Sequence, residues 1–262
     1  MSQEYTSLGI IDLHSHLVPS VDDGTSSIEE SLTALEDLYR QGVRALVTTP
    51  HLLMPRLADD SEVELELELH RQSFDELQAV CAGRPDLPSI ALGQEIWAPD
   101  AAAIDRVLRH DVGLAGKTLL IEFGFELQGS HNDVVQAVIG AGRQILIAHP
   151  ERYTYLPGHD PVRVMRGWQE LGALLQVNVG SLTGHYARSS PGSERLAWDM
   201  AEQGLIDVLG TDHHGPRRTG VSPREALEAL IARGELGLAE RAMVDVPGQI
   251  LRNETGASRL PR

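Results

Sequence analysis

Two histidines one residue apart follow a short apolar run near the start of the chain. Residues 10–13 predict a buried strand, and residues i and i+2 of a strand point to the same side. His14 and His16 therefore direct both imidazoles to one point where the strand ends. Neutral imidazole is the commonest side-chain metal ligand. An isolated pair of this kind is more often structural, so the interpretation depends on whether the pattern recurs.

The same pattern, an apolar run followed by a metal-type donor, does recur along the chain. Six more strands are predicted, at residues 43–49, 89–93, 118–121, 144–148, 173–179 and 206–210. Nitrogen and oxygen donors without thiolate suit Mn²⁺, Fe²⁺ or Zn²⁺, and nine donors exceed the need of one or two ions. The sequence thus favours three divalent cations that share a bridging carboxylate. The donors associated with strand ends are His14, His16, Asp23, His51, Glu95, Glu122, His149, Asp212 and His214.

Helical patterns fill the gaps between these strands, so the chain alternates strand and helix. Alternation predicts parallel pairing with right-handed crossovers. An open sheet would show a glycine-rich phosphate loop after its first strand, and histidines stand there instead. A closed parallel barrel is therefore expected, because its strands end on one face and that face carries the chemistry. Residues 1–262 are predicted to form one domain, with a frayed tail from Asn253.

The composition excludes several classes of function. The 262 residues carry a formal charge of −16, which argues against a nucleic-acid or anionic-membrane surface. No apolar run is long enough for a transmembrane helix, and residues 1–9 lack a signal peptide's apolar core. The single cysteine, Cys81, suits the cytoplasm. Three divalent cations among four carboxylates would leave the filled site at about +2, so an acidic protein could still bind a phosphate.

Seven sequence stretches, in order from Ile11 to His214, carry a family resemblance. They are IDLHSHLVPSVDDG, VTTPH, GQEI, LIEF, IAHPERY, LQVN followed by SLTG, and GTDHH. Together they resemble the polymerase-and-histidinol-phosphatase (PHP) metalloenzymes. Within that group the chain is most similar to the bacterial protein-tyrosine phosphatases of capsule and exopolysaccharide operons.

This resemblance implies an α/β fold of the distorted TIM-like (β/α)7 type and a trinuclear site, most simply with Mn²⁺. It implies that Asp23, rather than Asp22, is the ligand of the DDG stretch, while Asp22 braces the loop. The family's phosphate-binding arginines match Arg152 and either Arg217 or Arg218. The implied ligand groups are His14, His16, Glu95 and Asp212 on one ion, Glu95, Glu122 and His149 on a second, and Asp23, His51 and His214 on the third.

The function implied is hydrolysis of phosphotyrosine on a bacterial tyrosine kinase that controls capsule or exopolysaccharide synthesis. Metal coordination lowers the pKa of water to about 7, and the hydroxide so formed would attack phosphorus. Arg152 would stabilise charge on the phosphoryl oxygens through a bidentate fork. A phenolate, with a conjugate-acid pKa of about 10, needs little help in leaving. An alkyl ester would need a general acid, for which His185 and His213 are candidates.

Two alternatives stay open. The first is a small-molecule phosphatase of the same barrel, such as a histidinol-phosphate phosphatase, and the second is a metal-binding scaffold without activity. A cysteine-dependent phosphatase is excluded, because Leu87 stands six residues after Cys81 where an arginine is needed, and no GxSxG elbow occurs. The remaining histidines are predicted to be surface residues: His70, His110, His131 and His159.

Overall fold

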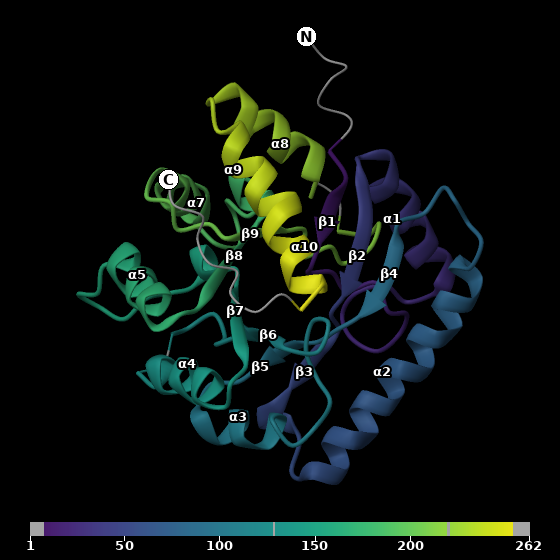
Figure 1. Ribbon diagram of the computed structural model, residues 1–262, viewed down its shortest axis with the longest axis horizontal. Coiled ribbons are helices and arrows are strands. Elements are labelled where there is room, and N and C mark those ends of the chain that lie inside the picture. Colours follow the sequence, from purple (N-terminus) through teal and green to yellow (C-terminus); the bar gives the residue numbers. More distant parts are fainter. Residues whose placement is uncertain (1–7, 128, 219–220, 254–262) are drawn as a thin grey trace.

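The computed structural model describes residues 8–127, 129–218 and 221–253 of the chain. Within these ranges every strand pair is parallel, and helices separate most of the strands along the chain (Figure 1). The predicted parallel α/β class is therefore confirmed. The strands are β1 (Ile10–Asp12), β2 (Val43–Thr48), β3 (His51–Leu53), β4 (Ser89–Leu92), β5 (Glu95–Trp97), β6 (Thr118–Glu122), β7 (Gln144–Ala148), β8 (Leu174–Asn178) and β9 (Val208–Gly210).

Helices lie around the strands, and several begin at a side chain that caps them. Ser27, Asp59 and Asp100 each accept a hydrogen bond from a backbone N–H of the first turn, which satisfies a group that the helix itself cannot. Short 3₁₀ turns, η2 (Met54–Arg56) and η3 (Pro150–Arg152), and a π-helical segment, η4 (Arg241–Asp245), complete the chain. The α-helices are α1 (Ile28–Arg40), α2 (Asp60–Cys81), α3 (Ala101–Val107), α4 (His131–Gly140), α5 (Pro161–Leu171), α6 (Val179–Leu182), α7 (Ser193–Glu202), α8 (Pro223–Ala232), α9 (Leu236–Glu240) and α10 (Val246–Leu251).

The nine short strands form a ring of seven. Hydrogen bonding gives one sheet in the order β1-β2-β4 and another in the order β3-β5-β6-β7-β8-β9. Only Thr49 and Pro50 separate β2 from β3, and only Gly93 and Gln94 separate β4 from β5. Each pair is thus one strand with an interruption, and these two interrupted strands join the two sheets. The seven strands predicted from the sequence are recovered in their predicted order.

Backbone hydrogen bonds between the exits of β9 and β1 join the two edges of this ring. The N–H of Asp212 donates to the carbonyl of His14, and the N–H of His16 donates to the carbonyl of His213, both at 2.8 Å. Ser15 and His213 also form a parallel bridge. The contacts that close the ring therefore involve the predicted metal donors themselves.

Consecutive strand residues point to two separate cores. Leu120, Leu146 and Leu174 belong to the cluster inside the ring, whereas the next residues, such as Ile121, face the helices. This alternation follows from the period of two in a strand. Ile250 of α10 joins the inner cluster, and Figure 1 shows α10 crossing in front of the strands. The inside of the ring is therefore filled by side chains. The predicted metal donors lie at the carboxyl ends of its strands.

Some expectations fail where tertiary packing overrides the local pattern. The continuations β3 and β5 were not predicted, because Pro50 and Gly93 interrupt the two strand patterns, and the helices α6 and α9 were missed because they are only four and five residues long. His70 and His131 were predicted at the surface, but both are buried. The Trp168 indole N–H donates to Nδ1 of His131 at 2.8 Å, so this histidine is a core residue. Apart from Asn253, the tail predicted to be frayed lies outside the described residues.

None of the helices in the described ranges is both long and apolar enough to cross a lipid bilayer.

Candidate metal centre

The nine predicted donors gather at the end of the ring where its strands finish. A cavity of about 960 Å³ opens there, and seven of the nine donors line it. The other two, His14 and His16, are fully buried beneath it. The elements that position the donors are β1 and the loop after it for His14, His16 and Asp23, the starts of β3 and β5 for His51 and Glu95, the end of β6 for Glu122, and the exits of β7 and β9 for His149, Asp212 and His214.

Four donor atoms form one tight cluster. The Nε2 atoms of His14 and His16 are 3.3 Å apart. Each of them lies 3.3 Å from Oε2 of Glu95 and 3.4–3.5 Å from Oδ1 of Asp212. Four donors arranged tetrahedrally at about 2.1 Å from one ion would be about 3.4 Å apart. This cluster, which matches the predicted first group, could therefore hold one divalent cation.

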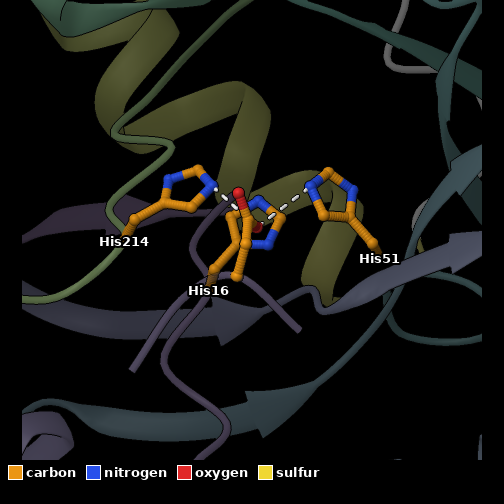
Figure 2. Close-up of side chains that lie close together, drawn as sticks. His16, His51 and His214 are labelled. Carbon is orange, nitrogen blue, oxygen red and sulfur yellow. Dashed lines mark ion pairs between the residues drawn. The ribbon is translucent and has the colours of Figure 1, made fainter. Parts of the chain in front are cut away.

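A second cluster contains the predicted third group. Oδ1 of Asp23 lies 3.5 Å from Nε2 of His51 and 3.4 Å from Nε2 of His214 (Figure 2). The ring of His16 lies between those two histidines in Figure 2, and its centroid is 4.1 Å from that of His214. Donor atoms of His16, Asp23, His51 and His214 all lie within 4.8 Å of one another. This group could hold a cation nearer to solvent than the first.

Glu95 connects the remaining donors. Its Oε1 lies 2.9 Å from Nε2 of His149, and its Oε2 lies 3.0 Å from Nδ1 of His51. The donors expected around the second ion fall into two overlapping groups, His14–Glu95–His149 and His51–Glu95–Glu122. Glu122 and His149 do not share a group, but both share one with Glu95. A bridging position for Glu95 fits this arrangement.

The electrostatics of the centre favour bound positive charge. Burial alone would lower the pKa of His14 and of His16, but the carboxylates of Glu95 and Asp212 outweigh it and raise both pKa values above 6.5. In the same way, and against the effect of burial, the histidines hold the pKa of Asp212 below its ordinary value. Oε2 of Glu95 is buried and makes no hydrogen bond among the described residues, although three ring nitrogens lie within 3.3 Å of it. Divalent cations would satisfy this field, so the residues present fit a metal centre.

Neighbouring polar groups fix the orientation of the two buried histidines. Nδ1 of His14 lies 2.9 Å from Oε1 of Gln176, and Nδ1 of His16 lies 2.7 Å from Oδ2 of Asp22. Both contacts leave Nε2 of each ring directed into the cluster. A partner on the second ring nitrogen is the usual arrangement around metal-bound histidine. Asp22 also accepts the N–H of Gly24, so the prediction that it braces the loop is correct but incomplete.

A line of side-chain amides continues from His14 to Asp212. Gln176 donates to Oδ1 of Asn178, and Asn178 in turn donates to Oδ2 of Asp212, both at 2.7 Å. Gln176 and Asn178 are two apart in β8, so they share the inner face of the ring. Neither amide was predicted from the sequence to belong to the site. Two amides on one face of an otherwise apolar strand are the signal that could have identified them.

Two of the donors have an unfavourable backbone conformation. His149 has φ 34° and Asp212 has φ 52°, in the left-handed region that non-glycine residues seldom adopt. Each follows directly, or after one residue, from the end of its strand. Such conformations persist where the surrounding structure imposes them, and they concentrate at functional sites. The strain therefore supports a functional role for both side chains.

Arg152 lies beside the first cluster. Its Nη1 donates to Oδ2 of Asp212 at 2.8 Å, while Oδ1 of the same carboxylate faces the two histidines. The guanidinium carbon is 4.2 Å from the ring centroid of Tyr186 and 5.0 Å from that of Phe125. Its Nε is buried without a hydrogen-bond acceptor among the described residues. Arg152 thus has an unused donor fixed next to the cavity.

The two candidates for the second arginine lie in different places. Arg218 lines the cavity, and its Nη2 lies 2.7 Å from Oδ2 of Asp23. Arg217 instead pairs with Glu30 near the start of α1 and does not line the cavity. Arg56 also lines the cavity, although it was not predicted to belong to the site. It lies in η2 directly after β3, the strand continuation that the sequence pattern did not predict.

The two histidines considered as general acids lie elsewhere. Neither His185 nor His213 lines the cavity. Nδ1 of the buried His213 accepts the N–H of Gly215, and burial lowers the pKa of His213 to about 4. The ring of His185 packs edge-on against Tyr186. The described residues therefore place no histidine other than the metal-type donors in the cavity.

The ring and its donors define a class: a parallel α/β barrel with a histidine–carboxylate centre at the strand ends. Residues 10–252 match the family described as capsular polysaccharide synthesis, CpsB/CapC. The chain belongs to this family.

Two similar proteins and one solved structure agree with this membership. The tyrosine-protein phosphatase CpsB of Streptococcus pneumoniae is 24% identical over 94% of this chain and 99% of its own length. The tyrosine-protein phosphatase YwqE of Bacillus subtilis (strain 168) is 27% identical over 84% of each chain. A crystal structure from work on YwqE and CpsB, described as unique metal-dependent tyrosine phosphatases, matches with a TM-score of 0.75 at 24% identity, over 94% of this chain and 96% of that one.

Replacing Asp22 with Asn tests the role of the buried carboxylate beside His16. The substitution removes the negative charge that orients and polarises the imidazole, so the affinity for Mn²⁺ should fall about 10- to 100-fold. Competition with a fluorescent chelator measures that affinity, and circular dichroism checks the fold. Asp105→Asn, at an exposed position in α3, is the matched control. An unchanged affinity in the Asp22 variant would show that the contact does not support metal binding.

Proposed function

We propose that the protein is a metal-dependent protein-tyrosine phosphatase that acts as a single phosphoesterase domain. The observation that carries this proposal is the double role of Asp212. One of its oxygens faces the imidazoles of His14 and His16, and the other accepts a hydrogen bond from Arg152. A guanidinium that could bind phosphate is thereby fixed beside a cluster of side chains that could bind metal.

Three divalent cations, with Mn²⁺ as the first choice and Fe²⁺ or Zn²⁺ as alternatives, are the proposed cofactors. Bound there, they would supply Lewis-acid chemistry, which lowers the pKa of water and offsets the charge of the phosphate. The proposed ligands are those predicted from the sequence: His14, His16, Glu95 and Asp212; Glu95, Glu122 and His149; Asp23, His51 and His214.

The chain's own residues bind and orient the phosphoryl group. Arg152 is already fixed by Asp212 and by the ring of Tyr186, so its free N–H groups can donate to phosphoryl oxygens with little loss of entropy. Arg218, in the segment after β9, lines the same cavity. In hydrolysis a water oxygen forms a bond to phosphorus as the bond to the aryl oxygen breaks. The phenolate then takes a proton from solvent, which agrees with a cavity without a separate histidine acid.

The proposed physiological substrate is a phosphotyrosine-bearing bacterial kinase of capsule or exopolysaccharide synthesis, and the proposed compartment is the cytoplasm. Support comes from the family description and from relatives named tyrosine-protein phosphatases. The formal charge of −16 argues against a nucleic-acid partner.

A comparison of two substrates tests the proposed reaction. The Mn²⁺-loaded protein should hydrolyse a phosphotyrosyl peptide with a kcat/KM more than about tenfold above that for histidinol phosphate, because an alkyl leaving group needs a general acid and no histidine beyond the proposed metal ligands lines the cavity. EDTA should abolish activity, and added Mn²⁺ should restore it. A tenfold preference for the alkyl ester would favour the small-molecule phosphatase instead. Activity that survives EDTA would rule out metal dependence.

The neighbouring arginines provide a matched pair of variants. Arg218→Ala should raise KM for the phosphotyrosyl peptide about tenfold, because a charged hydrogen bond to the phosphate is lost. Arg217→Ala should leave KM within about twofold, since its exposed pair with Glu30 contributes little. Steady-state kinetics on both proteins measure the difference. The assignment is wrong if the Arg217 variant shows the larger defect.

A further inference from the structure

Phe125 is an exposed aromatic residue at the edge of a charged cavity. About 52% of its surface is accessible to solvent, and it is one of five large apolar residues in the described ranges that are exposed. Of these five, Phe125 is the one that lines the metal cavity. Most of the other cavity residues are ionisable. An exposed aromatic ring in the lining of a cavity can make apolar contact with a ligand bound there.

Its neighbours hold this ring next to the residues that handle phosphate. The ring of Phe125 stacks on that of His149, with centroids 6.2 Å apart and planes inclined by 18°. The guanidinium carbon of Arg152 lies 5.0 Å from the centroid of Phe125. The carbonyl of Phe125 accepts the N–H of Thr154 at 2.7 Å, which ties this loop to the segment after Arg152. Phe125 and Arg152 therefore have a fixed relative position.

We propose that Phe125 determines the preference for aryl over alkyl phosphates by packing against the aromatic ring of the substrate. The inference rests on the proposed function and adds the residue that selects the substrate class. In phosphotyrosine the ring is bonded directly to the ester oxygen. A phosphoryl group held by Arg152 therefore places that ring within reach of Phe125. An alkyl phosphate brings no aromatic face and loses this contact.

The geometry favours this role over a purely structural one. Because half of Phe125 is exposed, truncating it removes little from the core. Aromatic pairs are favourable at centroid separations of about 4.5–7 Å, in addition to the apolar area that they bury. The contact would act on binding of the substrate ring and leave the reacting atoms untouched. Phe125 is thus a specificity residue and takes no part in bond making or breaking.

Binding of two phosphonates to wild type and Phe125→Ala tests the proposal. Phenylphosphonate carries the ring and methylphosphonate does not, and both can be measured as competitive inhibitors and by calorimetry of the Mn²⁺-loaded protein. The variant should bind phenylphosphonate about tenfold more weakly and methylphosphonate within about twofold of wild type. Its KM for a phosphotyrosyl peptide should rise in parallel, with kcat within about twofold. The Phe125→Trp variant, which keeps an aromatic ring, should bind phenylphosphonate nearly as tightly as wild type.

Leu171→Ala is the matched control, because Leu171 is another exposed apolar residue but lies outside the cavity, at the end of α5. If both phosphonates weaken equally in the Phe125 variant, the residue acts through Arg152 or His149, and the inference is overturned. If neither weakens, Phe125 makes no contact with the ring, which also overturns it. A wild-type protein that hydrolyses no phosphomonoester contradicts the proposed function itself, so the two failures are distinguishable.

Discussion

Opposite charges are buried together at one end of the strand ring. The Nε2 atoms of His14 and His16 lie 3.3 Å apart, and each lies 3.3–3.5 Å from a carboxylate oxygen of Glu95 and of Asp212. Burying ionisable groups is costly unless other charges compensate. Here the carboxylates raise the pKa of both histidines against the effect of burial. The centre is therefore arranged for positive charge, and divalent cations would supply it.

The fold provides this centre through the places where its strands stop. Two strands are interrupted, and the residues that resume them, His51 and Glu95, are donors. Two others are followed by left-handed residues, His149 and Asp212, which are also donors. The hydrogen bonds that join the exits of the first and last strands involve the backbone of the same donor segments. The same segments therefore close the ring and supply the donors. The surrounding structure can thus impose the left-handed backbone conformations of His149 and Asp212.

The parts of this arrangement that depend on neighbours in sequence could be predicted. Eight of the nine donors lie within four residues of the end of a predicted strand, so the order of the seven strands and most of the candidate donors could be predicted from the pattern. Contacts between distant residues were not. Gln176 orients His14 across 162 positions, and only the folded ring brings them together. The burial of His131, the separation of Arg218 from Arg217 and the position of Phe125 likewise depend on packing that no local pattern encodes.

Anomalous X-ray diffraction from crystals grown with Mn²⁺ would locate the bound ions. We expect three peaks per chain, one of them among His14, His16, Glu95 and Asp212. The other two should lie within bonding distance of Glu95 and Asp23. If no peak appears among the first four donors, or if ions bind only elsewhere, the proposed metal centre is wrong.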